Sequence, residues 1–260
     1  MRGPAGGKNK IVNPPNRIIV TGGATNIGRA ITEAFLAQGA SVAVGQRNPA
    51  VIAPLVEKYG NRVIALRLDL EQPKLCRAFI DEAAARLGGV DVLVNNAAVT
   101  GPGVTRTFAE IDEAYIDHIF NVNVRGVLLC SQAVVPHLRR SGGGAIIHIS
   151  SINAFRPQRG AMVYAASKAA MTSLTQSMAK ELATDNIRVV AVAPGAIGTG
   201  RNELLTQELK ERGMTSDVAG MAPLGEGVPD NISSVVTFLC SEGARYVTGT
   251  TWLVDGGLLS

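Results

Sequence analysis

The chain has 260 residues, of which 46% are hydrophobic and 18% are charged, and its formal net charge is +4. This length fits one large α/β domain or two small ones, and the apolar content supplies a sizeable core, which excludes global disorder. The basic residues are scattered, so we expect no nucleic-acid partner. The three cysteines and three histidines show no metal-ligand spacing. This predicts no metal site and reduced thiols in a cytoplasmic protein.

Residues 1–16 form a segment rich in Gly, Pro and Asn, which predicts a flexible N-terminal tail. The segment has no long apolar core, so we do not expect a secretory signal. Further along, no apolar run reaches membrane-spanning length, because the uncharged stretch 189–200 is short and contains Pro194. We therefore expect no membrane association.

From residue 17 onward, short β-rich runs alternate with helical stretches. Most of these runs are almost continuously apolar, as is typical of parallel strands buried on both faces: 17–21, 41–46, 62–68, 91–95, 145–150, 187–193 and 251–254. His148, inside the fifth run, is expected to be a hydrogen-bonded structural histidine. Apolar residues recur at helical spacing over 27–38, and Gly39 is placed to end that helix. The alternation predicts a doubly wound Rossmann fold, with a seven-stranded parallel sheet and helices on both faces, in a single domain over 17–260.

The stretch TGGATNIG, Thr21 to Gly28, follows the first strand and opens the first helix. Gly22 permits a tight turn, and Gly28 lets the helix approach the sheet or a pyrophosphate closely. The helix N-terminus offers free N–H groups to a phosphate. Asn26 stands where a glycine is usual, but Asn enters left-handed backbone space at low cost, so we expect a left-handed Asn26 facing the site entrance or capping local backbone. The alternative is an ordinary glycine-rich turn.

The second strand ends at Gln46, and Arg47 follows it. A site that prefers NAD has a carboxylate here, which accepts a hydrogen bond from the adenosine ribose and repels a 2′-phosphate. A guanidinium without a carboxylate favours NADP(H) over NAD(H). The alternative is that Arg47 is a solvated loop residue.

Chemistry is indicated by YAASK, Tyr164 to Lys168, because two residues four apart on a helix share a face. A nearby ammonium stabilises a phenolate, so the pair is suited to proton transfer. Ser151 follows the fifth strand and can polarise a carbonyl, with Ser150 as its competitor and a capping role as the alternative. Asn123 lies inside a predicted helix, where asparagine is unfavourable, so its presence indicates a specific role. Asn121 is the competing residue, but it points to a different helix face.

These motifs, in this order, resemble the short-chain dehydrogenase/reductase family, from Arg17 to the closing stretch VTGTTWLVDGG at 247–257. The turn resembles T-G-x-x-x-G-x-G, NNAA at 95–98 resembles N-N-A-G, and PGAIGT at 194–199 resembles P-G-x-I-x-T. The resemblance implies a catalytic tetrad of Asn123, Ser151, Tyr164 and Lys168, in which Asn123 steadies a helix distortion and a proton-relaying water. It implies cofactor contacts at Gly22, Thr25, Asn26, Ile27, Gly28, Gln46, Arg47, Asp69, Leu70, Asn96, Ala97, Tyr164, Lys168, Pro194, Gly195, Ile197 and Thr199.

The implied reaction interconverts a ketone or aldehyde and an alcohol by hydride transfer, with Tyr164 as the acid or base. A 3-oxoacyl-thioester reductase acting on an acyl carrier protein is the narrower alternative, and a non-catalytic dinucleotide-binding regulator is an alternative of another class. Pocket-bordering candidates are Phe155, Arg156, Gln158, Arg159 and Met162, and a lid is expected over 201–226 with Leu204, Leu205, Met214 and Met221. The resemblance also implies a homotetramer that acts on a small molecule.

Overall fold

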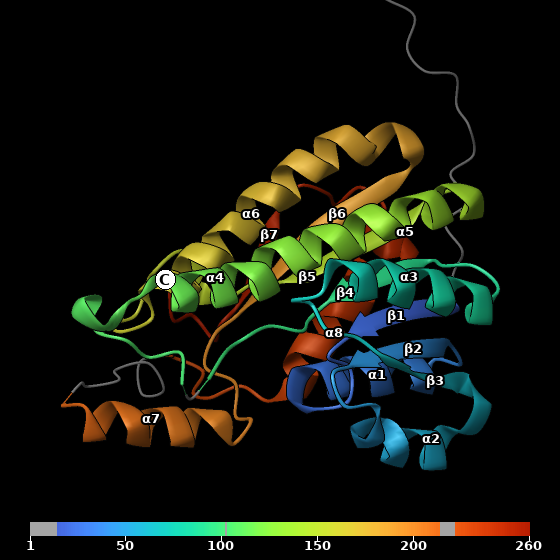
Figure 1. Cartoon of the computed structure of the whole chain (residues 1–260). Helices are drawn as coiled ribbons and strands as arrows, with labels where there is room; N and C mark the ends of the chain where they lie inside the picture. Colours follow the sequence, from blue (N-terminus) through green and yellow to red (C-terminus); the bar gives the residue numbers. More distant parts are fainter. Residues whose placement is uncertain (1–14, 102, 214–221) are drawn as a thin grey trace, which may run out of the picture.

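The computed structural model describes residues 15–101, 103–213 and 222–260. Seven strands form one sheet in the order β3-β2-β1-β4-β5-β6-β7, and every neighbouring pair is parallel (Figure 1). The strands are β1 (Arg17–Thr21), β2 (Ser41–Gln46), β3 (Val63–Arg67), β4 (Val92–Asn95), β5 (Gly144–Ile149), β6 (Ile187–Pro194) and β7 (Thr251–Val254). The predicted fold class is confirmed, and the strand bounds agree with the apolar runs to within a residue.

Helices cover both faces of the sheet (Figure 1). One face carries α1 (Asn26–Ala37), α2 (Ala53–Tyr59) and α8 (Pro229–Leu239). The other carries α3 (Pro73–Leu87), α4 (Glu113–Phe120), α5 (Val127–Ser141) and α6 (Met162–Leu182). The helix α7 (Arg201–Glu211) lies outside these layers. Short 3₁₀ turns occupy Pro49–Ile52, Gly60–Arg62, Phe108–Glu110, Ile152–Ala154, Ala183–Asp185 and Glu242–Ala244.

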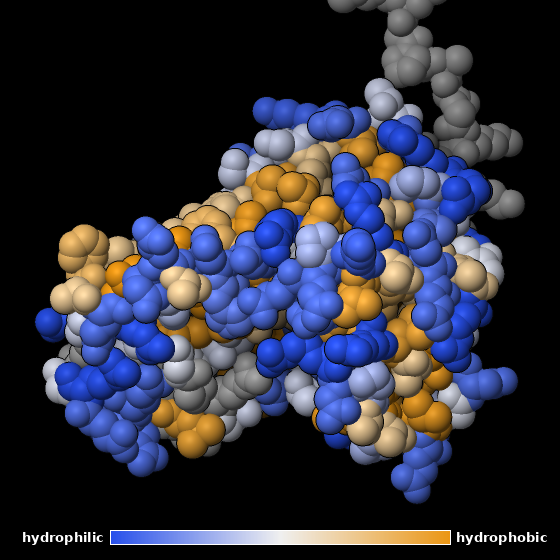
Figure 2. Space-filling view, viewed as in Figure 1, coloured by the Kyte–Doolittle hydropathy of each residue, from blue (hydrophilic) through white to orange (hydrophobic). Residues whose placement is uncertain are grey.

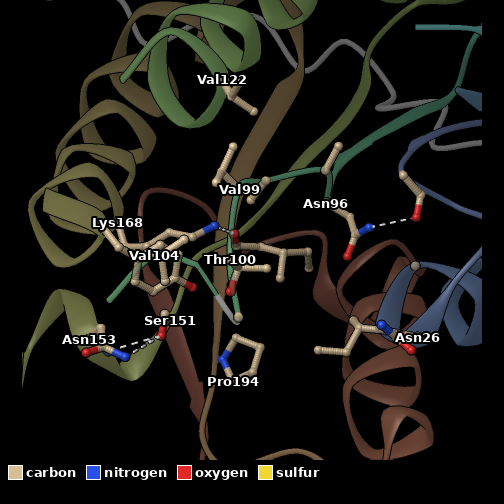
Figure 3. Close-up of a pocket in the computed structure, with 18 of the residues that line it drawn as sticks. Asn26, Asn96, Val99, Thr100, Val104, Val122, Ser151, Asn153, Lys168 and Pro194 are labelled. Atoms are coloured by element: carbon tan, nitrogen blue, oxygen red, sulfur yellow. Dashed lines mark hydrogen bonds between the residues drawn. The ribbon is translucent and has the colours of Figure 1, made fainter. Parts of the chain in front are cut away.

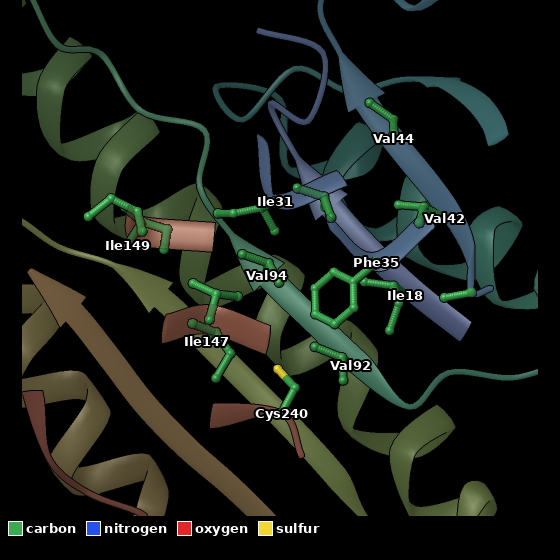
Figure 4. Close-up of a cluster of buried hydrophobic side chains, with 14 of the residues drawn as sticks. Ile18, Ile31, Phe35, Val42, Val44, Val92, Val94, Ile147, Ile149 and Cys240 are labelled. Atoms are coloured by element: carbon green, nitrogen blue, oxygen red, sulfur yellow. The ribbon is translucent and has the colours of Figure 1, made fainter. Parts of the chain in front are cut away.

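The two faces of each strand bury separate hydrophobic clusters. Ile18 and Val20 point toward α1 and α8, where they join Phe35 (Figure 4). Ile19 points to the opposite face and joins Phe79 of α3. Because successive side chains of a strand alternate between faces, a central strand covered on both sides must be apolar at every position. This requirement explains the continuous apolar runs in the sequence.

The start of the sheet is fixed by Asp91, which is almost completely buried. Its Oδ2 accepts hydrogen bonds from Asn16 N at 3.0 Å and Arg17 N at 2.9 Å, and its Oδ1 pairs with the Arg17 guanidinium. Pro15 is buried as well. Two residues of the expected tail, Pro15 and Asn16, therefore lie with the sheet. Residues 1–14 lie outside the described part of the chain, where the flexible tail stays a prediction.

One helical stretch is longer and more apolar than the sequence led us to expect. From Glu113 to Ser141 the chain is continuously helical over 29 residues, and by length and apolar composition alone this stretch could cross a membrane. Core helices of water-soluble proteins can have the same length and composition. Here its residues Cys130, Val134 and Leu138 pack into the cluster beneath the sheet. The stretch serves this fold as a layer helix.

His148 is a buried residue of β5, as expected, but only part of its ring is hydrogen-bonded. Its Nδ1 lies 2.9 Å from Thr175 Oγ1, whose own hydroxyl donates to Met171 O at 2.8 Å. The ring therefore donates from Nδ1. Its Nε2 is buried and has no hydrogen-bond partner among the described residues. Burial, followed by the nearby charge of Lys168, lowers the pKa of His148 to about 3.

This burial predicts an acid-dependent loss of stability. Below its ordinary pKa of 6.5, His148 takes up a proton in the unfolded chain, whereas the folded protein excludes that proton down to about pH 3. Stability is therefore intact above 6.5 and falls as the pH drops, by about 3 kcal/mol between about pH 6 and about pH 4. Urea unfolding across this range should show the His148→Asn variant losing less stability than the wild type. Parallel pH dependences for the two proteins would contradict the assignment.

Candidate active site

A cleft of about 560 Å³ opens at the carboxyl edge of the sheet (Figure 3). It lies between the parallel strands β1 and β4, where the strand order reverses and the chain segments that follow the two strands turn to opposite sides. Such a switch point is where doubly wound sheets bind ligands. The cleft is lined by all the predicted cofactor contacts and three of the four predicted catalytic residues: Gly22, Thr25, Asn26, Ile27, Gly28, Gln46, Arg47, Asp69, Leu70, Asn96, Ala97, Ser151, Tyr164, Lys168, Pro194, Gly195, Ile197 and Thr199. The fourth, Asn123, lies behind its wall.

The turn between β1 and α1 has the shape of a phosphate cradle. Gly22 and Asn26 have positive φ angles of 66° and 50°, so the left-handed backbone expected at Asn26 is confirmed. The Asn26 side chain borders the cleft (Figure 3). Thr25 precedes α1 without capping it through its side chain, which leaves first-turn N–H groups for a ligand. A Cβ at Gly28 would lie 2.1 Å from Gly22 O, so only glycine fits there. These residues fit a dinucleotide pyrophosphate.

Thr21 and Asn96 join the ends of β1 and β4. Thr21 Oγ1 accepts hydrogen bonds from the backbone N of Asn96 and of Ala97, both at 3.0 Å. Asn96 Nδ2 donates to Thr21 O and Gly22 O, both at 3.1 Å. The Asn96 side chain therefore stabilises the phosphate turn from the neighbouring strand.

The far end of the cleft has polar edges suited to an adenosine. Arg47 is exposed there, beside Gln46. The Asp69 carboxylate accepts bonds from Glu71 N at 3.1 Å and Gln72 Nε2 at 2.9 Å, so it shapes its own loop as well as the cleft. His118 of α4 closes this end through a 2.8 Å contact of its Nδ1 with Glu71 Oε1. His118 and Glu71 both line the cleft, and the sequence reading did not select either.

Tyr164 and Lys168 stand one turn apart on α6 and share the opposite end of the cleft. The Lys168 Nζ lies 5.7 Å from the centroid of the Tyr164 ring. It donates to Ile149 O at 2.8 Å. Burial lowers the pKa of Lys168, and the proximity of Tyr164 opposes this shift. A buried ammonium is thus fixed beside the phenol.

The two consecutive serines at the end of β5 have different uses. Ser150 Oγ donates to Lys168 O at 3.1 Å, so its proton is engaged in the structure. Ser151 caps the 3₁₀ turn Ile152–Ala154, because its Oγ accepts a bond from Asn153 N at 3.1 Å. Its O–H proton is free to reach the cleft. The capping role considered for this serine is real, and it is compatible with a role toward a ligand.

Asn123 lies in a π-helical turn, Asn121–Gly126, that joins α4 to α5. Its Oδ1 accepts from Val99 N at 2.8 Å, and its Nδ2 donates to Val99 O at 3.2 Å and to Ser167 Oγ at 3.1 Å. The expected helix distortion is present. Asn123 itself is 1% exposed, so it reaches the cleft only through Val99 and α6.

Only some of the other expected pocket residues line the cleft. Gln158 and Arg159 line the cleft, whereas Phe155, Arg156 and Leu204 are exposed and do not line it. Met162 lines a neighbouring cavity. Met214, Met221 and the side chain of Leu205 lie outside the described residues.

The lid region contributes Leu209 of α7, which is 5% exposed and lines the cleft. The helix is joined to the loop before α4 by a 2.9 Å bond from Gly103 N to Glu208 Oε2 and a 3.1 Å contact of Arg212 with Glu110. Several lining residues after β4, such as Val99, Thr100 and Thr105, were not predicted individually. Because ligands bind at the carboxyl ends of parallel strands, the loop after β4 as a whole could have been predicted to line the cleft.

Comparison with known proteins identifies the scaffold. Residues 22–259 match a family model described as enoyl-(acyl carrier protein) reductase. The chain is 35% identical over 245 residues to a 3-oxoacyl-[acyl-carrier-protein] reductase, FabG, of Thermotoga maritima, covering 93% of this chain and 96% of the relative. It is 34% identical over 247 residues to a D-xylose 1-dehydrogenase of Caulobacter vibrioides, covering 93% and 94%.

Among solved structures, a 3-ketoacyl-(acyl-carrier-protein) reductase from Brucella melitensis complexed with NADH superposes with a TM-score of 0.84 at 28% identity, covering 94% of this chain and 98% of that one. The chain belongs to the short-chain dehydrogenase/reductase family. It is an oxidoreductase that interconverts carbonyl compounds and alcohols with a nicotinamide dinucleotide. The expected enzyme class is therefore confirmed.

The cradle at Gly28 generates a direct test. The Gly28→Ala variant forces a Cβ against Gly22 O and Asn96 Nδ2. It should destabilise the fold by about 1–3 kcal/mol and weaken binding of the nicotinamide dinucleotide by about tenfold or more. Thermal unfolding and fluorescence titration measure the two effects. Gly243→Ala is the control, because its Cβ would meet ordinary 3.4 Å contacts far from the cleft. Unchanged dinucleotide affinity in Gly28→Ala would remove this turn from the cofactor site.

Proposed function

We propose that the protein is an NADP(H)-dependent carbonyl reductase and alcohol dehydrogenase, with Asn123, Ser151, Tyr164 and Lys168 as its catalytic machinery. The observation that carries the proposal is the placement of the Tyr164–Lys168 pair and Ser151 in the same cleft as the phosphate cradle. Figure 3 shows Ser151 and Lys168 on one side of this cleft and Asn26 and Asn96 on the other. A dinucleotide lying along the cleft would present its nicotinamide beside Ser151.

Each residue has a distinct task in this mechanism. When bound, the nicotinamide donates or accepts the hydride. Tyr164 gives a proton to the substrate oxygen in reduction and takes it in oxidation. Ser151 donates a hydrogen bond to the same oxygen and stabilises the charge that builds there. Lys168 stabilises the phenolate form of Tyr164 and would hold the nicotinamide ribose, and Asn123 connects Val99, in the loop after β4, to Ser167 of α6.

The cofactor preference is part of the proposal. Arg47 is exposed at the adenosine end and lines the cleft, where a guanidinium can bind a 2′-phosphate. The second strand ends in Gln46, which offers no negative charge to repel that phosphate. NADP(H) is accordingly favoured over NAD(H), and Pro194, Gly195, Ile197 and Thr199 would hold the nicotinamide end.

We propose two candidate substrate classes, and each corresponds to the named activity of one group of relatives. One is a small ketone, aldehyde or alcohol, and the other is a 3-oxoacyl thioester carried by an acyl carrier protein. NADPH oxidation with acetoacetyl-coenzyme A, with 2,3-butanedione and with simple aldehydes, together with NADP⁺ reduction by D-xylose, separates them. NADPH binding without turnover on any of these compounds would favour the non-catalytic regulator.

We further propose a cytoplasmic homotetramer without membrane or nucleic-acid partners, built from a single domain over 17–260. Figure 2 shows apolar surface along α6, which lies beside α4 and α5. Ile116, Leu128 and Met162, on these three helices, are 40%, 41% and 50% exposed. Burial of such side chains between copies of the chain would stabilise the assembly. Light scattering gives the subunit number directly.

Removal of the phenol hydroxyl tests the proton-transfer role. The Tyr164→Phe variant keeps the ring but loses the exchangeable proton, so kcat should fall by about a hundredfold or more. The affinity for NADPH should change by less than about twofold, since the phosphate cradle is untouched. Stopped-flow turnover and fluorescence titration report these quantities. Near-normal turnover in this variant would refute the assignment of Tyr164.

Charge reversal at Arg47 tests the cofactor preference. The Arg47→Asp variant replaces a guanidinium that can donate hydrogen bonds to the 2′-phosphate with a carboxylate that repels it. The ratio of kcat/KM for NADPH to kcat/KM for NADH should therefore fall by about tenfold or more. Lys180→Asp is the control, because Lys180 is exposed in the last turn of α6, remote from the cleft-lining residues. An identical ratio in wild type and Arg47→Asp would exclude Arg47 from the site.

A further inference from the structure

Two N–H groups of Asn153 point at the hydroxyl oxygen of Ser151. The backbone N of Asn153 lies 3.1 Å from Ser151 Oγ, and its side-chain Nδ2 lies 3.4 Å from the same atom (Figure 3). Asn153 belongs to the 3₁₀ turn Ile152–Ala154 and is 8% exposed. Both contacts therefore lie in a largely dry environment, where an incorrectly paired polar group is costly.

The orientation of the Asn153 amide is fixed by a third hydrogen bond. Gln158 N donates to Asn153 Oδ1 at 2.9 Å. A backbone N–H can only donate, so the side-chain atom that it meets must be the oxygen. The other end of the amide, which faces Ser151, must therefore be the NH₂ group.

These contacts determine how Ser151 can hydrogen-bond. A serine hydroxyl has two acceptor lone pairs and one proton. Asn153 occupies both lone pairs, so the proton is the remaining hydrogen-bonding group of Ser151 and is directed into the cleft. The neighbouring Ser150 shows the opposite outcome, since its proton is donated to Lys168 O.

We propose that Asn153 is a positioning residue that makes Ser151 an obligate hydrogen-bond donor to the substrate oxygen. The inference rests on the proposed function, because it refines the task of Ser151 in that reaction. Without Asn153, the Ser151 hydroxyl could rotate and present a lone pair to the substrate oxygen, which repels developing negative charge. Asn153 thus contributes through Ser151, by orientation before the substrate arrives.

The Asn153→Asp variant tests this with almost no change of shape. The carboxylate can still accept the bond from Gln158 N, but its second oxygen now accepts the Ser151 proton and draws it away from the cleft. We expect kcat to fall roughly tenfold to hundredfold, with unchanged affinity for NADPH. Asn153→Ala keeps the backbone N–H bond and should lose less activity than Asn153→Asp. The matched control is Asn61→Asp, an identical change at an exposed turn away from the cleft, which should leave kcat unchanged.

A pH profile separates orientation from simple damage. When the carboxyl group that Asn153→Asp introduces takes up a proton, it can donate to Ser151 Oγ again, so the ratio of variant to wild-type kcat should rise as the pH falls. Arg106, Arg159, Tyr164 and Lys168 line the same or the adjoining cavity. These groups are present in both proteins, so their titration is shared and largely cancels in the ratio. A structural defect would give a ratio that does not recover at low pH.

The outcomes distinguish this inference from the proposed function. A wild type that turns over the carbonyl panel, with an Asn153→Asp variant of equal kcat, overturns the positioning role alone. If the wild type turns over nothing, the proposed function fails, and neutron diffraction of the deuterated wild-type protein still decides the inference. A deuteron on Ser151 Oγ directed into the cleft supports it, and a deuteron directed at Asn153 overturns it.

Discussion

The hydrogen bonds between Thr21 and Asn96 set the geometry on which the proposed cofactor-binding half of the cleft depends. β1 and β4 are neighbours in the sheet, but the chains that leave them turn to opposite sides, so backbone groups at both strand ends need partners. The Thr21 hydroxyl accepts two backbone N–H groups from the β4 side, and the Asn96 amide satisfies two carbonyls on the β1 side. The glycine turn can then stay open toward a phosphate without collapsing onto the sheet.

The half of the cleft that we propose to be catalytic depends on buried polar groups that are held by backbone N–H and C=O groups. Lys168 donates to Ile149 O, Ser150 donates to Lys168 O, and Asn123 binds both backbone groups of Val99. Backbone partners are fixed by the sheet and helices, so these side chains have little rotational freedom left. In the proposed mechanism, the positions for proton transfer are thus assembled before any ligand arrives, at the cost of burying an ammonium and a half-satisfied histidine.

Much of this arrangement could be read from the sequence, because its signals are local. Strand bounds follow from apolar runs, and the left-handed backbone of Asn26 follows from the chemistry of asparagine. The Tyr164–Lys168 geometry follows from helix periodicity. The burial of Asn123 behind the wall does not, because it depends on a π-helical turn and on how α4 and α6 pack. The orientation of the Asn153 amide could not be predicted either. It is set by Gln158, across a turn whose conformation no sequence periodicity encodes.

The π-helical turn Asn121–Gly126 touches both halves of the cleft. Asn123 binds Val99 near the catalytic end, while Gly126 packs so closely on Leu70 that a Cβ there would lie 2.6 Å from Leu70 O. Leu70 lines the adenosine end. A single helical segment therefore contacts residues that line both ends of the cleft. A π-helical turn holds one more residue than an α-helical turn, which rotates the side chains that follow it, so this irregular turn is what lets one segment contact both ends of the cleft.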